Sequence, residues 1–150
     1  MGISPDGLSS PRLERHALAR PDELAGLRTA VWRYAMDQGA SQEVAQAVRL
    51  AVGEALTNVV MHAYVGRDSG AMTVKAWVDD DDHLNVEILD EGHGLIPRAD
   101  SPGLGLGMGL MAQMADDLRI TNREGHPGTS VCLRFSLAES QELCGCGAAP

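Results

Sequence analysis

Apolar residues recur every three or four positions between residues 48 and 63, the period of an α-helix with one buried face. They are Val48, Val52, Ala55, Leu56, Val59, Val60 and Ala63. Glu54, Asn58 and His62 recur every four residues beside that face, on one polar stripe. The pattern predicts a helix that begins at Ser41 as its N-cap and carries a carboxylate and a carboxamide one turn apart, both half-buried.

Alternation of apolar and polar residues predicts strands before and after this helix. Residues 12–20 alternate as an edge strand does. The other strand patterns occupy four segments: 71–78, 83–90, 117–124 and 129–137. A second helix should begin at Pro21 and run to about Asp37, with Gly39 as the residue that stops it. Residues 106–116 have helical spacing, and the prolines and glycines of residues 95–105 predict a mobile loop before them.

The length of 150 residues predicts one domain, placed at residues 12–138 between a disordered tail (1–11) and a loose tail (139–150). A net charge of −9 and a pI of about 4.8 argue against nucleic acid and anionic membrane as partners. No apolar run approaches the about 20 residues needed to span a bilayer. Two of the three cysteines lie in the tail, which favours a reducing, cytoplasmic compartment.

Four consecutive aspartates, Asp79 to Asp82, separate two of the strand patterns. Four carboxylates in a row raise the question of a calcium site, but their spacing matches no calcium-binding loop. We therefore interpret this segment as the solvated tip of a hairpin.

Asp90, Gly92 and Gly94 lie where a strand pattern ends and a loop begins. A carboxylate at this place can accept a hydrogen bond from an exocyclic amine, and glycines let the backbone approach a flat ligand closely. Many tight turns share this motif, so it is weak on its own. Thr129 opens the last strand, where its hydroxyl could donate to a base, although a β-branched residue entering a strand needs no such role.

Four glycines alternate with large apolar residues where the third helix begins: Gly103, Gly105, Gly107 and Gly109. Backbone N–H groups at a helix start, with the helix dipole behind them, form a phosphate site. A flexible hinge is the alternative interpretation. The P-loop, dinucleotide-binding and protein-kinase motifs are absent, and the only lysine of the chain, Lys75, lies inside a strand.

Four blocks stand in order along the chain: EALTNVVMHAY (54–64), DEGHG (90–94), GLGLGMGL (103–110) and GTSVCLRF (128–135). In this order they resemble the boxes of the Bergerat-fold (GHKL) ATPases, the superfamily of gyrase and the histidine kinases. The first block resembles most closely that of the bacterial anti-sigma-factor serine/threonine kinases. The resemblance covers residues 12–137 and implies an α/β two-layer sandwich, with a mixed, mostly antiparallel sheet and helices on one face.

The resemblance implies ATP and Mg²⁺ as cofactors. It makes Glu54 the catalytic general base for an attacking hydroxyl and Asn58 the Mg²⁺ ligand next to the phosphates. It assigns the adenine amino group to Asp90 and support of the base to Thr129. His62 would be an orienting hydrogen-bonding residue of the site.

The glycines take the remaining ATP-binding roles. Gly92 and Gly94 would give the backbone room beside the base, and the lid around the phosphates would be formed by four glycines: Gly103, Gly105, Gly107 and Gly109. Related kinases often place an arginine just before the lid glycines, where it reaches the γ-phosphate. Here Ser101 and Pro102 occupy that place, and the nearest arginine is Arg98.

The implied function is phosphorylation of a serine or threonine on a STAS-type anti-sigma-factor antagonist, together with sequestration of a sigma factor. The resemblance leaves a homodimer open. One alternative is a nucleotide-dependent sequestering protein with little or no kinase activity. A detached histidine-kinase catalytic domain fits poorly, because the sequence holds no phosphoacceptor helix.

Overall fold

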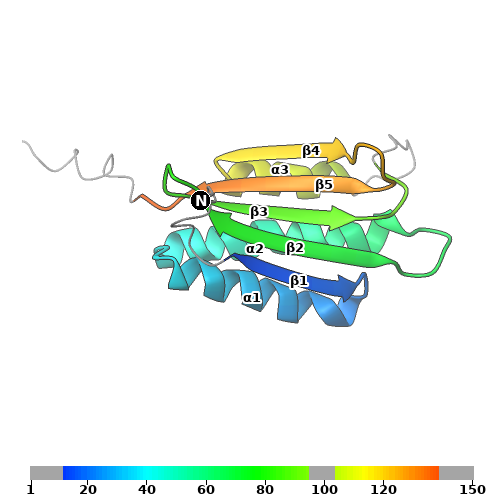
Figure 1. Ribbon diagram of the computed structural model, residues 1–150, viewed down its shortest axis with the longest axis horizontal. Helices are drawn as coiled ribbons and strands as arrows, with labels where there is room; N and C mark the ends of the chain where they lie inside the picture. The colour runs from blue at the N-terminus through cyan, green and yellow to red at the C-terminus, as the bar shows by residue number, and fades with distance from the viewer. Residues whose placement is uncertain (1–11, 95–103, 139–150) are drawn as a thin grey trace, which may run out of the picture.

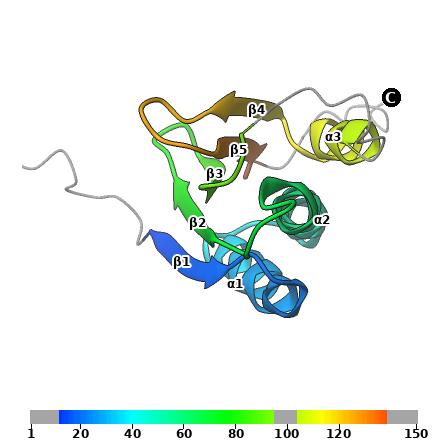
Figure 2. The same ribbon diagram turned by 90° about the vertical axis from the view of Figure 1, so that its right-hand side faces the viewer.

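The computed structural model describes residues 12–94 and 104–138, which form a five-stranded sheet with helices on one face (Figure 1). The elements in chain order are β1 (Leu13–Leu18), the 3₁₀ turn η1 (Pro21–Glu23), α1 (Leu24–Asp37), α2 (Gln42–Asn58), the π-helical turn η2 (Val59–Ala63), β2 (Ala71–Val78), β3 (His83–Asp90), α3 (Leu104–Met114), β4 (Asp117–Asn122) and β5 (Thr129–Ser136). The predicted two-layer α/β fold is confirmed. Viewed along the strands, helices α1, α2 and α3 lie on the same side of the sheet (Figure 2).

The strand order is β1-β2-β3-β5-β4, and all four pairings between these described strands are antiparallel. The parallel pair that a mixed sheet would contain is therefore not found in the described part of the chain. The reason lies in the connection through α3. This connection makes β4 run parallel to β3. Because β5 lies between β3 and β4 in the sheet, the two parallel strands do not pair.

The core lies between the sheet and α2. The inward residues of neighbouring strands form cross-strand rows, such as Ala76, Val86, Leu133 and Leu118. Val48, Val52 and Leu56 of α2 cover these rows and are fully buried. Each such side chain stabilises the fold by about 1.5–3 kcal/mol.

The segment Gln42–Ala63 is 22 residues long and contains an 18-residue window with a mean hydropathy of 1.2, enough by length and composition to cross a membrane. This departs from the expectation that no such run exists. The helix resembles a membrane span because it is long and has an apolar face. That apolar face belongs to the core described above. The segment is therefore explained as the central helix of the domain.

The helix ends follow the predicted signals at α1 and α2. Gly39 ends α1 with a φ of +93°, and Ser41 Oγ accepts a hydrogen bond from Val44 N at 3.1 Å as the N-cap of α2. The helix α3 begins at Leu104, two residues before the predicted start. Glycines disfavour helix, but packing of the fully buried Met111 and the contact of α3 with α2 outweigh that preference.

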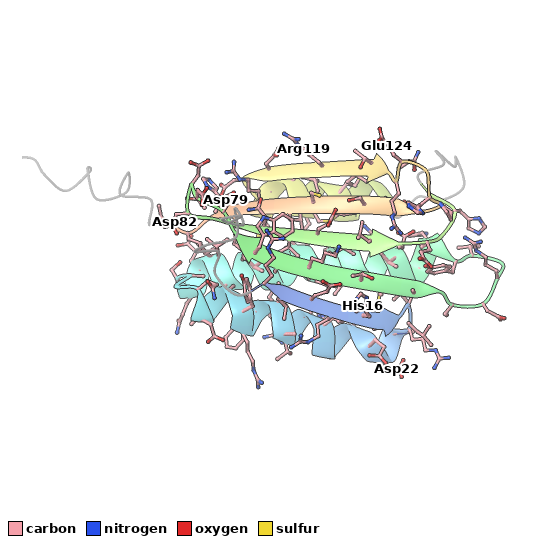
Figure 3. The ribbon with its side chains drawn as sticks, viewed as in Figure 1. His16, Asp22, Asp79, Asp82, Arg119 and Glu124 are labelled. Carbon is pink, nitrogen blue, oxygen red and sulfur yellow. The ribbon has the colours of Figure 1, made fainter. Side chains whose placement is uncertain are left out.

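The aspartates between β2 and β3 form a hairpin tip at the end of the sheet, as predicted, but the first of them is not simply solvated (Figure 3). Asp79 is half-buried and accepts hydrogen bonds from Asp81 N, His83 N, Asn85 Nδ2 and Arg134. Burial alone would raise the pKa of the Asp79 carboxyl. The hydrogen bonds outweigh burial and lower its pKa from 3.8 to about 2.

Asp79→Asn should destabilise the protein by about 1–3 kcal/mol near neutral pH, because it removes the charge from hydrogen bonds that a carboxylate accepts. A lowered native pKa means that this stability is present above the ordinary value of 3.8 and is lost as the pH falls towards about 2. Urea unfolding across that range measures it. The exposed neighbour Asp80, changed to Asn, is the control. If the two variants unfold alike at every pH, the assignment to Asp79 is wrong.

Candidate nucleotide site

The site is centred on Asp90, the last residue of β3. Alternation along β3 places Asp90 on the inward face after Ile88, and only 4% of it is exposed. Its Oδ1 accepts hydrogen bonds from Gly92 N at 2.9 Å and from Thr129 N at 3.2 Å. Three residues predicted for one site, Asp90, Gly92 and Thr129, are thus brought together by the sheet.

The second carboxylate oxygen of Asp90, Oδ2, accepts no hydrogen bond from any residue in the described ranges 12–94 and 104–138. Burial raises the pKa of this carboxyl, while the N–H groups of Gly92 and Thr129 and the charges of Arg123 and Arg67 lower it in part. A carboxylate oxygen that no described residue uses can accept a hydrogen bond from an N–H donor of a ligand.

The glycines around Asp90 are required by close packing. A Cβ on Gly92 would collide with the carbonyl oxygen of Ala63, and one on Gly128 would collide with the carbonyl oxygen of Asp90. Gly94 has a φ of +76°, which favours glycine. Gly92 therefore fits the loop onto the end of the helical segment, a role that the sequence motif did not indicate.

The side chains of Glu54 and Asn58 are half-buried on the last turns of α2. Neither makes a hydrogen bond or ion pair with another described residue. By contrast Thr57, which lies between them, donates its hydroxyl to Gly53 O at 2.7 Å. The carboxylate of Glu54 and the amide of Asn58 are thus available to a ligand, whereas the intervening hydroxyl is used by the helix.

The π-helical turn η2 follows Asn58 directly, and π turns often occur at functional sites. His62 lies on it, half-buried, and makes no side-chain hydrogen bond within the described residues. Tyr64, the next residue after η2, is buried, and its hydroxyl accepts from Glu91 N at 2.8 Å and donates to Ala71 O. Burial raises the pKa of Tyr64, so this hydroxyl stays protonated and keeps donating.

Sequence reasoning gave no role to Arg123, which the structure places at the site. The Nη1 atom of Arg123 donates to the backbone carbonyl of Asp90 at 3.1 Å, and the backbone N–H of Arg123 donates to Gly128 O at 3.1 Å. The sequence signal that could have indicated this role is a basic residue between the last two strands. Its partner is a backbone atom in another strand, so the sequence alone could not identify the contact.

Helix α3, which carries the glycines predicted to form the lid, lies beside α2 (Figure 2). Only the first N–H groups of an α-helix lack partners within it, and in α3 these include the N–H of Gly105. Gly109 lies further into the helix, where its N–H group bonds to the preceding turn. Among the described glycines, Gly105 and Gly107 remain as predicted phosphate donors. Gly103, Arg98 and most of the predicted mobile loop lie outside the described residues.

Two hollows of the described surface lie away from this site. One, of about 670 Å³, lies between β1 and α1 and is lined by residues such as Leu13, Gly26 and Tyr34. The other, of about 310 Å³, lies on the face of the sheet that the helices leave open. Neither contains a residue predicted to bind ATP.

Comparison with protein families matches residues 17–135 to a histidine kinase-like ATPase domain. The match covers more than half of the chain. The chain belongs to the histidine kinase-like ATPase domain family. This confirms the resemblance drawn from the four ordered blocks.

Two relatives show where in this family the chain stands. An anti-sigma F factor of Clostridium acetobutylicum is 27% identical over 141 residues, covering 85% of this chain and 96% of the relative. The serine-protein kinase RsbW of Listeria monocytogenes is 30% identical over 122 residues, covering 71% of this chain and 77% of the relative. The chain is thus similar, over most of its length, to family members with these two names.

Solved structures of the family share the fold. The RsbU and RsbW domains of a Mycobacterium tuberculosis protein match 85% of this chain with a TM-score of 0.68 at 20% identity. The histidine kinase domain of a blue-light activated histidine kinase from Erythrobacter litoralis matches 83% with a TM-score of 0.58 at 25% identity. This chain spans 33% and 64% of those two chains, respectively.

Proposed function

We propose that this family member is an ATP-binding serine/threonine kinase of the anti-sigma-factor type, acting in the cytoplasm. It would phosphorylate a STAS-type antagonist protein and, in its other state, hold a sigma factor. The observation that carries the proposal is the buried Asp90 carboxylate, fixed through one oxygen with the other unused, at the end of β3 in a histidine kinase-like ATPase fold. The names of the two most informative relatives support the choice of substrate and partner.

The base-binding step follows from the chemistry of Asp90. An adenine amino group donates to the unused Oδ2, whereas guanine presents a carbonyl oxygen at the same place, which a carboxylate repels. Thr129 N and Gly92 N hold the other oxygen, so the carboxylate does not have to reorient when the base arrives. The site is thus preorganised for adenine.

Phosphoryl transfer requires a base, an electrophile and charge neutralisation. The carboxylate of Glu54 takes the proton from a serine or threonine hydroxyl, and that oxygen attacks the γ-phosphorus. The bond from the γ-phosphorus to the β–γ bridging oxygen breaks, and ADP leaves. Bound Mg²⁺ would neutralise phosphate charge, and the amide oxygen of Asn58, which has no other described partner, suits its preference for oxygen ligands.

ATP binding should depend on Mg²⁺. The chain has one lysine, Lys75, and within its described part no group of three or more His, Cys, Asp or Glu residues could hold a metal ion. The triphosphate must therefore supply most of the metal ligands. Calorimetry should show ATP affinity falling about tenfold or more when a chelator is added. Equal affinity in both conditions would remove Asn58 from its metal role.

A nucleotide-dependent sequestering protein without useful transfer is the second candidate. The observation that favours it is the sequence before the lid, where Ser101 and Pro102 replace the arginine of related kinases. Charge stabilisation is the main protein contribution to phosphoryl transfer, so its loss would reduce transfer more than binding. Incubation of the protein and a retained antagonist with γ-labelled ATP distinguishes the two, because only the kinase moves label to the antagonist.

A further inference from the structure

The side chain of Tyr64 lies where the next backbone pair of the β2–β3 ladder would form. The β2–β3 register ends with Met72 opposite Asp90, so the next pair would join Ala71 to Glu91. The hydroxyl of Tyr64 lies between these two residues instead. It accepts from Glu91 N at 2.8 Å and donates to Ala71 O.

The direction of the backbone groups shows that a direct hydrogen bond has been replaced. Backbone groups of successive strand residues point to opposite neighbours. Gly70 O accepts from Ala19 N on the β1 side, so the carbonyl of Ala71 faces the β3 side. An unmodified antiparallel ladder would therefore bond Glu91 N directly to Ala71 O. The inserted hydroxyl satisfies both groups and holds the two backbones apart.

Other contacts draw the same segment towards the end of the helix. His93 N donates to Ala63 O at 2.9 Å, and Arg67 Nη2 donates to Glu91 O at 3.4 Å. The guanidinium of Arg67 also lies 5.5 Å from the centroid of the Tyr64 ring. Residues 91–94 therefore leave β2 directly after Asp90 and lie against the segment that follows Asn58.

The Tyr64 ring itself is held in place. It is 9% exposed, and a Cβ on Gly70 would collide with it. Gly70 thus leaves the space that the ring fills. The hydroxyl is fixed through this packing and through its two backbone partners.

We propose that Tyr64 is a positioning residue for base recognition: its hydroxyl ends the β2–β3 ladder at Asp90 and thereby fixes the Asp90 loop for adenine. This rests on the proposed function in taking adenine as the ligand. Without the hydroxyl, Glu91 N and Ala71 O can bond directly. The ladder then extends by one pair, and the backbone on the C-terminal side of Asp90 moves towards β2.

Tyr64→Phe tests the proposal in the full chain with two readouts. Without nucleotide, NMR should show new cross-strand contacts between Ala71 and Glu91, which reports on the ladder independently of ATP. With nucleotide, calorimetry should show ATP affinity lowered about five- to tenfold, the scale of one hydrogen bond, and a smaller preference for ATP over GTP. Gly70→Ala, which displaces the ring without removing the hydroxyl, should also reduce the preference.

Tyr34→Phe is the matched control, because the Tyr34 hydroxyl is buried and has no hydrogen-bond partner among the residues that the structure describes. Its removal should leave the ATP preference unchanged. An unchanged ladder in Tyr64→Phe, or a wild-type ATP-to-GTP ratio in that variant, overturns the positioning role. A wild-type protein that binds no ATP would instead refute the proposed function, and the ladder measurement would still decide whether the hydroxyl ends the β2–β3 pairing.

Discussion

Glu54→Gln is expected to slow phosphate transfer by about 10²- to 10⁴-fold while leaving ATP affinity nearly unchanged, the range for loss of a general base. Glutamine keeps the size of the side chain but cannot take a proton from the incoming hydroxyl. Because Glu54 makes no hydrogen bond or ion pair with another described residue, its replacement breaks no described contact. Thermal unfolding, ATP calorimetry and transfer of labelled phosphate measure the three quantities separately.

Two variants on the same helix sharpen this prediction. Asn58→Ala should weaken ATP binding itself, since it removes a ligand of the metal that is bound before the reaction. Glu43→Gln removes a carboxylate from the exposed first turn of α2 and should change neither binding nor transfer. A structural role for Glu54 predicts a lower melting temperature together with weaker binding. Transfer at the wild-type rate in Glu54→Gln would favour the sequestering protein over the kinase.

Asp90→Asn should weaken ATP binding about 10- to 100-fold and yet leave the nucleotide-free protein equally or more stable. Asparagine Oδ1 can still accept from Gly92 N and Thr129 N, but Nδ2 then presents N–H groups where the adenine amino group should donate. Loss of such a buried partner costs about 1–3 kcal/mol. Competition between ATP and GTP, followed by calorimetry, measures the loss of preference.

The stability half of this prediction follows from the raised pKa of Asp90. A carboxyl whose native pKa lies above its ordinary value of 3.8 favours the folded state below that value, and this contribution is lost as the pH rises through the native pKa. Asparagine removes the buried charge and with it this pH dependence. Glu91→Gln, at the exposed neighbouring position, is the control for net charge. A strongly destabilised Asp90→Asn would mean that the carboxylate is structural.

The pattern of apolar and polar residues predicts element boundaries well where buried and more exposed side chains alternate along the chain. The patterns at 71–78 and 83–90 match β2 and β3 residue for residue, because every second side chain enters the core. The pattern at 117–124 is two residues longer than β4. The start of α3 was predicted two residues late, since Gly105 reads as loop and only packing against α2 makes that turn helical.

The site was predictable to the extent that motifs mark it. Asp90 and Thr129 were expected to share one site, and the sheet places them in contact. Tyr64 and Arg123 were not assigned, because their partners are backbone atoms of Glu91 and Asp90 in other segments. Such contacts depend on strand register and on where a ladder ends, and neither is encoded by residue type at a fixed spacing.

Transfer of label from γ-labelled ATP to a protein retained from the native host, mapped to single residues, tests the central claim most directly. The account predicts that an antagonist-like protein is labelled on one serine or threonine in the presence of Mg²⁺, and that Glu54→Gln retains the partner but labels it at least about a hundredfold more slowly. A partner that is retained with ATP but never labelled by the wild-type protein would contradict the kinase.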